Sequence, residues 1–177
     1  MSSGGSEDNS GGRVVWITGL SGSGKSTLAT ALVQALQRRL PSRPVLLDGD
    51  ALREVLGSAH GAFDLEGRLK LAYTYGRLCR LLALQGQWVV IATVSLFHEV
   101  QEWNRLKLPG YFEVFLDIPA AECARRNPKG LHHAAGSMVG FEVRAEYPRT
   151  PELVLSQGLS VEEEVAAVMR GLFDRQP

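Results

Sequence analysis

The stretch Gly19-Leu20-Ser21-Gly22-Ser23-Gly24-Lys25-Ser26-Thr27 decides the fold of this chain. It fits the pattern G-x-x-x-x-G-K-[ST]. The apolar run Val14–Ile17 before it is typical of a buried strand. After it, leucines recur every four residues, which indicates a helix: Leu28, Leu32, Leu36 and Leu40. Strand, glycine loop and helix in this order predict a phosphate-binding P-loop rather than a plain Gly/Ser turn.

Each part of the loop suits a polyphosphate. Glycines let backbone N–H groups come close to the phosphates, and the start of the helix adds a partial positive charge. The pattern assigns Lys25 to the β- and γ-phosphates of ATP and the hydroxyl of Ser26 to Mg²⁺. We therefore predict ATP and Mg²⁺ as cofactors, bound by Gly19, Ser21, Gly22, Ser23, Gly24, Lys25, Ser26 and Thr27.

The whole chain limits the class of protein. Its 177 residues suffice for one domain, and its 19 Lys and Arg balance 19 Asp and Glu. This balance gives no basic surface for nucleic acid or membrane, and no run is apolar enough for a signal peptide or a membrane span. Cys79 and Cys123 lack metal-ligand spacing and indicate reduced thiols. We expect a cytoplasmic protein with a small-molecule partner; a homodimer is permitted but not predicted.

The order of the elements predicts the fold. Residues 1–12 are expected to be a disordered tail, and 13–177 a single domain. Apolar runs predict strands at Val14–Thr18, Val45–Asp48, Trp88–Thr93, Phe112–Asp117 and Leu153–Leu155. Helices are predicted at Lys25–Arg39, Leu65–Gln85, Pro119–Arg126 and Val161–Phe173, the last with a capping box from Ser160 to Glu163. The result is an α/β fold of three layers, with a five-stranded parallel sheet flanked by helices.

Several classes of P-loop protein do not fit. A signalling GTPase needs an N-K-x-D segment, which this chain lacks. A motor-type ATPase usually has an acidic residue at the end of a later strand, but Trp88–Ala92 runs into Thr93-Val94-Ser95. The leading class is then the small-molecule kinases, which close an Arg/Lys-bearing lid over the acceptor.

A second polar segment follows the second strand. Leu47–Arg53 brings Asp48, Asp50 and Arg53 to the carboxyl edge of the sheet, where ligands bind in such folds. A carboxylate there can accept the proton of an acceptor hydroxyl or bind Mg²⁺ through water. Asp-Gly-Asp is also a common turn sequence, so the local sequence leaves both interpretations open.

With these segments in view, the chain resembles the adenylyl-sulfate kinase family from Arg13 to about Gln157. The resemblance rests on blocks in the family's order: Gly19–Thr27, Leu47–Arg53, Phe112–Asp117, Arg126–Leu131 and, more weakly, Thr150–Leu155. It implies a P-loop kinase that moves the γ-phosphate of ATP to the ribose 3′-hydroxyl of adenylyl sulfate.

The resemblance also implies roles on the acceptor side. Asp48 matches a base or Mg²⁺-organising aspartate, and Asp50 stands with it among the substrate-binding residues. Arg53 and Arg68 match arginines that hold the acceptor, and Phe63 an aromatic that stacks on its base. The alternatives are loop packing for Phe63 and a solvated helix start for Arg68.

Further roles fall on the third strand and the lid. Ser95 matches a serine beside the acceptor phosphate. In the lid, about 126–148, Lys129 matches a catalytic lysine that also contacts the substrate, and Arg126 an arginine near the ATP base. Lys129 can alternatively be part of a surface turn.

The acceptor side departs from the family pattern. Leu71 replaces an asparagine, and Ser95-Leu96-Phe97-His98 stands where the family has Ser-Pro-Tyr-Arg. Thr93–Val100 and Val139–Glu142 are similar instead to a branch that phosphorylates cytidine diphosphoramidate for capsule modification. Since a site loses affinity when its hydrogen-bonding groups are removed, both acceptors stay open. A non-catalytic nucleotide-binding protein is the alternative from another class.

Overall fold

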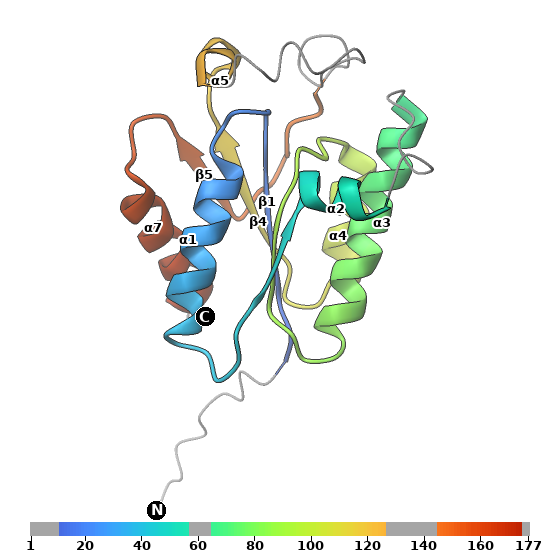
Figure 1. Cartoon of the computed structure of the whole chain (residues 1–177), viewed down its shortest axis with the longest axis vertical. Coiled ribbons are helices and arrows are strands. Elements are labelled where there is room, and N and C mark those ends of the chain that lie inside the picture. Colours follow the sequence, from blue (N-terminus) through green and yellow to red (C-terminus); the bar gives the residue numbers. More distant parts are fainter. Residues whose placement is uncertain (1–10, 57–64, 127–144, 175–177) are drawn as a thin grey trace, which may run out of the picture.

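The computed structural model describes residues 11–56, 65–126 and 145–174 (Figure 1). Phe63, Lys129 and most of the expected lid and tail lie outside the described residues. Gly12, which the sequence assigned to the tail, is buried, and a Cβ added to it would lie 2.1 Å from the carbonyl oxygen of Ala83. The packed domain therefore begins at least one residue earlier than expected.

The predicted three-layer α/β architecture is confirmed. The strands are β1 (Val14–Gly19), β2 (Val45–Asp48), β3 (Val89–Ala92), β4 (Phe112–Asp117) and β5 (Leu153–Ser156). They form a five-stranded parallel sheet in the order β2-β3-β1-β4-β5. The helices are α1 (Lys25–Gln37), α2 (Gly49–Leu56), α3 (Leu65–Ala83), α4 (His98–Lys107), α5 (Ala120–Arg126) and α7 (Val161–Phe173). Figure 1 shows α1 and α7 on one face of the sheet and α3 and α4 on the other.

The central strand β1 explains why an apolar run marks this fold. All its residues are buried, because helices cover both faces of the sheet. Val15 and Ile17 pack in the cluster that contains the residues of α1 and α7, whereas Val14 and Trp16 pack in the cluster that contains those of α3 and α4. Alternate side chains of one strand therefore build two separate cores.

Most element bounds agree with the sequence to within two residues, but α2 and α4 were not predicted. The core face of α4 consists of Val100, Gln101 and Asn104, two of which are polar, so no apolar stripe marks the helix. Only Gly49 of α2 is fully buried, and its eight residues are too few for the apolar positions to show a helical period in the sequence. The capping box of α7 is confirmed, since Ser160 Oγ accepts a hydrogen bond from the Glu163 N–H, and Glu163 Oε2 accepts one from the Ser160 N–H.

Within the described ranges, no helix is both long enough and apolar enough to span a membrane.

Candidate active site

The P-loop connects β1 to α1 in the shape that phosphate binding requires. Gly22 and Gly24 have φ angles of 83° and 102°, a region that glycine adopts without steric cost. Gly24 is the N-cap of α1, and the first turn of the helix has no acidic residue. The first N–H groups of a helix have no partner inside it, so this end of α1 favours an anion. The geometry fits a polyphosphate.

The side chain of Lys25 folds back over the loop. Its Nζ donates a hydrogen bond to the carbonyl oxygen of Leu20 at 2.7 Å. Burial lowers the pKa of Lys25 to about 8, and the negative charges of Asp50 and Asp48 oppose this shift. The ammonium group is thus costly to hold in the absence of a negative ligand, and a bound triphosphate would stabilise its charged form.

Binding of ATP should therefore be coupled to proton uptake by Lys25. Above a pH of about 8 the lowered pKa leaves this amine mostly neutral, and the phosphates would draw a proton back onto it. The affinity for ATP is expected to fall, by at most about tenfold per pH unit, as the pH rises above the lowered pKa. Calorimetry near pH ~9 in two buffers of different ionisation enthalpy measures the protons taken up.

The matched control is Lys25→Arg, whose guanidinium stays charged throughout this range and should remove the buffer dependence. Equal binding heats for the parent protein in both buffers would contradict the coupling.

Asp48 joins the P-loop helix to the second strand. Its Oδ2 accepts a hydrogen bond from Ser26 Oγ at 2.5 Å. Its Oδ1 accepts from the N–H groups of Asp50 at 2.9 Å and Ala51 at 3.4 Å, so Asp48 is also the N-cap of α2. The Asp-Gly-Asp sequence is therefore a helix start rather than a turn, and the cap aims one carboxylate oxygen at Ser26.

The pair Ser26 and Asp48 fits a Mg²⁺ site of the P-loop kind. Both supply oxygen, the ligand atom that Mg²⁺ prefers. No group of three or more His, Cys, Asp or Glu side chains that could hold a metal ion occurs among the described residues. A Mg²⁺ ion at this junction would hence take its remaining ligands from phosphate oxygens and water, as Mg²⁺ usually does.

The candidate acceptor arginines lie on two helices that follow β2. Arg53 on α2 pairs with Asp50, with Nη1 and Oδ1 3.3 Å apart and both side chains exposed. Arg68 lies half-buried in the first turn of α3. The hydroxyl of Tyr75 on α3 donates to the carbonyl oxygen of Gly49 at 2.9 Å and so links the two helices.

Ser95 lies in the loop 93–97 between β3 and α4, which we call the acceptor loop. Its φ of 26° is the only positive value among the described residues other than glycine. Its buried hydroxyl is 2.8 Å from Thr93 Oγ1. The carbonyl oxygen of Val94 accepts from Thr18 Oγ1 at 2.5 Å. Because β3 pairs with both β2 and β1, this loop lies at the same sheet edge as Asp48 and the P-loop.

Residues that depart from the family pattern have other partners here. Leu71 and Leu96 are buried and pack in the two hydrophobic cores, so neither replaces a polar acceptor contact. His98 begins α4, and its Nε2 is 2.9 Å from the carbonyl oxygen of Tyr147. Arg126, at the end of α5, donates from Nε to Glu122 Oε1 at 2.7 Å. Of the two residues predicted to act from the lid, Arg126 lies within the described residues and Lys129 lies outside them.

The sequence did not predict the roles of Thr18 and Glu146. Thr18 is the one hydroxyl side chain in a strand that is buried throughout, which was an available signal. The carboxylate of Glu146 accepts a hydrogen bond from the N–H of His98, 48 residues earlier in the sequence, so no local pattern marks this residue.

Comparisons with known proteins identify one family. A family model described as adenylylsulphate kinase matches residues 11–156. A cytidine diphosphoramidate kinase of Campylobacter jejuni is 33% identical over 166 residues, which cover 90% of this chain and 95% of the relative. An adenylyl-sulfate kinase of Gloeothece citriformis is 34% identical over 168 residues, which cover 91% and 94%.

A solved structure extends this similarity to three dimensions. An APS kinase of Mycobacterium tuberculosis in complex with AMPPNP and APS aligns with a TM-score of 0.82 at 32% identity, covering 92% of this chain and 98% of that one. The sequence and structure matches span the P-loop and the acceptor loop alike. The chain therefore belongs to the adenylyl-sulfate kinase family, whose members are ATP- and Mg²⁺-dependent phosphotransferases that act on an alcohol group.

Proposed function

We propose that this protein transfers the γ-phosphate of ATP to the ribose 3′-hydroxyl of a small nucleotide that carries a sulfate or phosphoramidate group. The observation that carries the proposal is the contact of 2.5 Å between Ser26 Oγ and Asp48 Oδ2, beside Lys25. It brings a hydroxyl suited to the metal and a carboxylate suited to the acceptor together at the mouth of the P-loop.

In this proposal the chain's own residues position the reactants. Lys25 neutralises charge on the β- and γ-phosphates, and Asp48 orients the acceptor hydroxyl and receives its proton. The acceptor oxygen forms a bond to the γ-phosphorus, while the bond from that phosphorus to the bridging oxygen of ADP breaks. A bound Mg²⁺ supplies neutralisation of phosphate charge. Most of the rate therefore comes from positioning and charge compensation.

The remaining residues hold the two nucleotides. Arg53 and Arg68 bind the anionic part of the acceptor, with Asp50 beside them, and Ser95 lies next to its phosphate. Phe63 stacks on the acceptor base. The lid, 126–148, brings Lys129 to the transferring group and Arg126 to the ATP base. These roles are carried over from the family resemblance, and the described positions of Arg53, Arg68 and Ser95 at one sheet edge support them.

Two acceptors are candidates. Adenylyl sulfate is the acceptor named by the family model and by several relatives. Cytidine diphosphoramidate is the second, because Leu71 is a core residue here rather than a polar contact, and because the Campylobacter jejuni relative is named for that substrate.

A phosphorylation screen tests the function. Purified protein with ATP and Mg²⁺ should phosphorylate adenylyl sulfate or cytidine diphosphoramidate at least about 100-fold more efficiently than AMP or CMP, since unpaired polar groups of the site penalise the plain nucleotides. Asp48→Asn, which keeps the shape of the side chain, should lower the rate by about 10²- to 10³-fold. Binding of ATP without transfer to any acceptor would instead favour a non-catalytic nucleotide-binding protein.

We further propose that the enzyme works in the cytoplasm, acts on no nucleic acid and can form a homodimer. Cys79 and Cys123 are both free and buried, which fits a reducing compartment. The net charge of zero gives no basic excess for nucleic acid and does not oppose self-association.

A further inference from the structure

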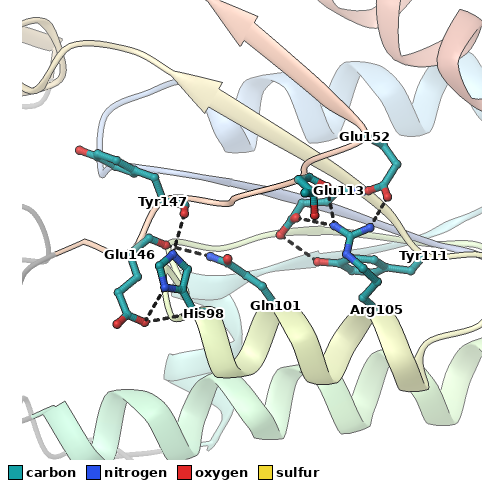
Figure 2. Close-up of polar contacts among 9 residues, drawn as sticks. His98, Gln101, Arg105, Tyr111, Glu113, Glu146, Tyr147 and Glu152 are labelled. Atoms are coloured by element: carbon teal, nitrogen blue, oxygen red, sulfur yellow. Dashed lines mark hydrogen bonds and ion pairs between the residues drawn. The ribbon is translucent and has the colours of Figure 1, made fainter.

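The segment that enters from residue 145 crosses the start of α4 (Figure 2). The N–H of Glu146 donates to the carbonyl oxygen of Leu96 at 3.1 Å. Its carboxylate Oε2 accepts from the N–H of His98 at 2.7 Å. Phe97 is the N-cap of α4 and has no side chain that can cap the helix. Glu146 therefore caps this helix from a distant part of the chain.

Two further hydrogen bonds strengthen this contact. Gln101, which is buried, donates from Nε2 to the carbonyl oxygen of Glu146 at 3.0 Å. The ring of His98 reaches the carbonyl oxygen of Tyr147 at 2.9 Å. We call the contacts of Glu146 with Leu96, His98 and Gln101 the Glu146 clasp; Figure 2 shows its side-chain contacts on the face of α4 that is turned toward the segment.

The clasp holds one end of the acceptor loop, and β1 holds the other. Thr18 Oγ1 binds the carbonyl oxygen of Val94, directly before Ser95, while Glu146 binds the carbonyl oxygen of Leu96, directly after it. A positive φ at a residue other than glycine is strained and persists only where its surroundings enforce it. The conformation of Ser95 thus depends on ties on both of its sides.

We infer that Glu146 is a positioning residue for the acceptor: it holds Ser95 in its strained conformation and couples the acceptor loop to the segment that follows residue 144. The inference rests on the proposed function for the role of Ser95. It assigns no contact between Glu146 and the substrate. Substitution of Glu146 is expected to lower kcat/KM for the acceptor and to leave the affinity for ATP unchanged, because the clasp contacts neither the P-loop nor Asp48.

The test compares three variants of the full chain. Glu146→Ala removes the carboxylate that caps α4 at the His98 N–H and keeps the main-chain bonds to Leu96 and Gln101. Loss of the cap should let the start of α4 and the acceptor loop shift and lower kcat/KM for the acceptor by up to about 10²-fold, the size expected for a displacement of about 1 Å in a reacting geometry. The affinity of this variant for ATP should stay within about twofold, since the P-loop is intact. Glu146→Gln keeps an oxygen that can cap α4 and should recover most of the loss.

The matched control is Glu102→Gln. Glu102 on α4 pairs with Arg149 at 3.5 Å, and both side chains are exposed, so this pair joins the same two parts of the chain without touching the acceptor loop. Its loss should leave the kinetics unchanged. Hydrogen exchange of residues 96–101 gives a second readout, which should rise in Glu146→Ala alone.

The outcomes separate this inference from the proposed function. If Glu146→Ala keeps the parent acceptor kinetics, or loses ATP affinity in parallel, the positioning role is overturned. If the parent protein phosphorylates no acceptor, the proposed function fails. Hydrogen exchange of residues 96–101 then still tests the clasp, and equal exchange in the parent protein and Glu146→Ala rejects it.

Discussion

Lys25→Ala should lower the rate of phosphoryl transfer by about 10³-fold or more. The Nζ of Lys25 lies over the P-loop, 2.7 Å from the carbonyl oxygen of Leu20, where the phosphates of ATP would replace that carbonyl as its partner. The variant leaves no cation at this position to offset the charge of the transferring group. The turnover of purified protein with a labelled γ-phosphate measures the loss.

Two controls make this result specific. Lys70→Ala removes an exposed lysine that pairs with Glu66 at 2.6 Å, far along the chain from the P-loop, and should change neither rate nor stability appreciably. Lys25→Ala should not melt below the parent protein, because burial lowers the pKa of Lys25 and the charged form therefore opposes folding at neutral pH. Parent-like turnover in Lys25→Ala would reject the assignment of this lysine.

Arg105→Ala should lower the free energy of unfolding by about 3–5 kcal/mol. Arg105 donates from Nη2 to Glu113 Oε2 at 3.0 Å and to the carbonyl oxygen of Thr150 at 2.9 Å, and it also pairs with Glu152 (Figure 2). Glu113 is only 1% exposed, and its other side-chain partner is the hydroxyl of Tyr111 at 3.0 Å. Removal of the guanidinium would leave this buried carboxylate without its cation.

Urea and thermal unfolding measure the effect, and a fall of roughly 6–20 °C in Tm corresponds to this range. The control is Arg125→Ala, which removes an exposed guanidinium from Glu122 while Arg126 remains as the partner of that carboxylate, and it should cost much less. Addition of Glu113→Gln to Arg105→Ala should restore part of the stability, because the unpaired charge is removed. Equal losses in Arg105→Ala and Arg125→Ala would contradict the role of the buried carboxylate.

The loss of stability in Arg105→Ala should also depend on pH. Burial raises the pKa of Glu113, and the hydrogen bond from Tyr111 and the charge of Arg105 oppose that shift. Without Arg105 the pKa rises further, so the folded variant prefers the protonated acid. Its deficit should therefore be smallest near the ordinary Glu pKa of 4.5 and grow as the pH rises through the raised value.

The sequence predicted those parts of the molecule whose cause is local. The P-loop is a contiguous pattern, and β1 is a continuous apolar run because both faces of the sheet are covered. α4 escaped prediction because its buried face is largely polar, and Gln101 on that face finds its partner in Glu146, which is distant in the sequence. Hydrophobic periodicity does not mark a helix when most of its buried residues are polar.

In the candidate site, too, the sequence predicted only what depends on neighbouring residues. The sequence of Asp48 left a turn and a catalytic role open, and only the folded chain shows the carboxylate as the cap of α2 with one oxygen directed at Ser26. The family pattern identified Leu71 as a changed residue. It could not show that this side chain packs in the hydrophobic core between α3 and the sheet. The assignments of Phe63 and Lys129 stay predictions.

The position of β2 in the sheet has a thermal consequence. This strand has four residues and pairs with β3 alone, yet it carries Asp48 at its end. An edge strand with one neighbour frays at lower temperature than the interior strands of the same sheet. Warming should therefore displace Asp48, and with it the proposed position of the acceptor hydroxyl, while the interior strands are still folded.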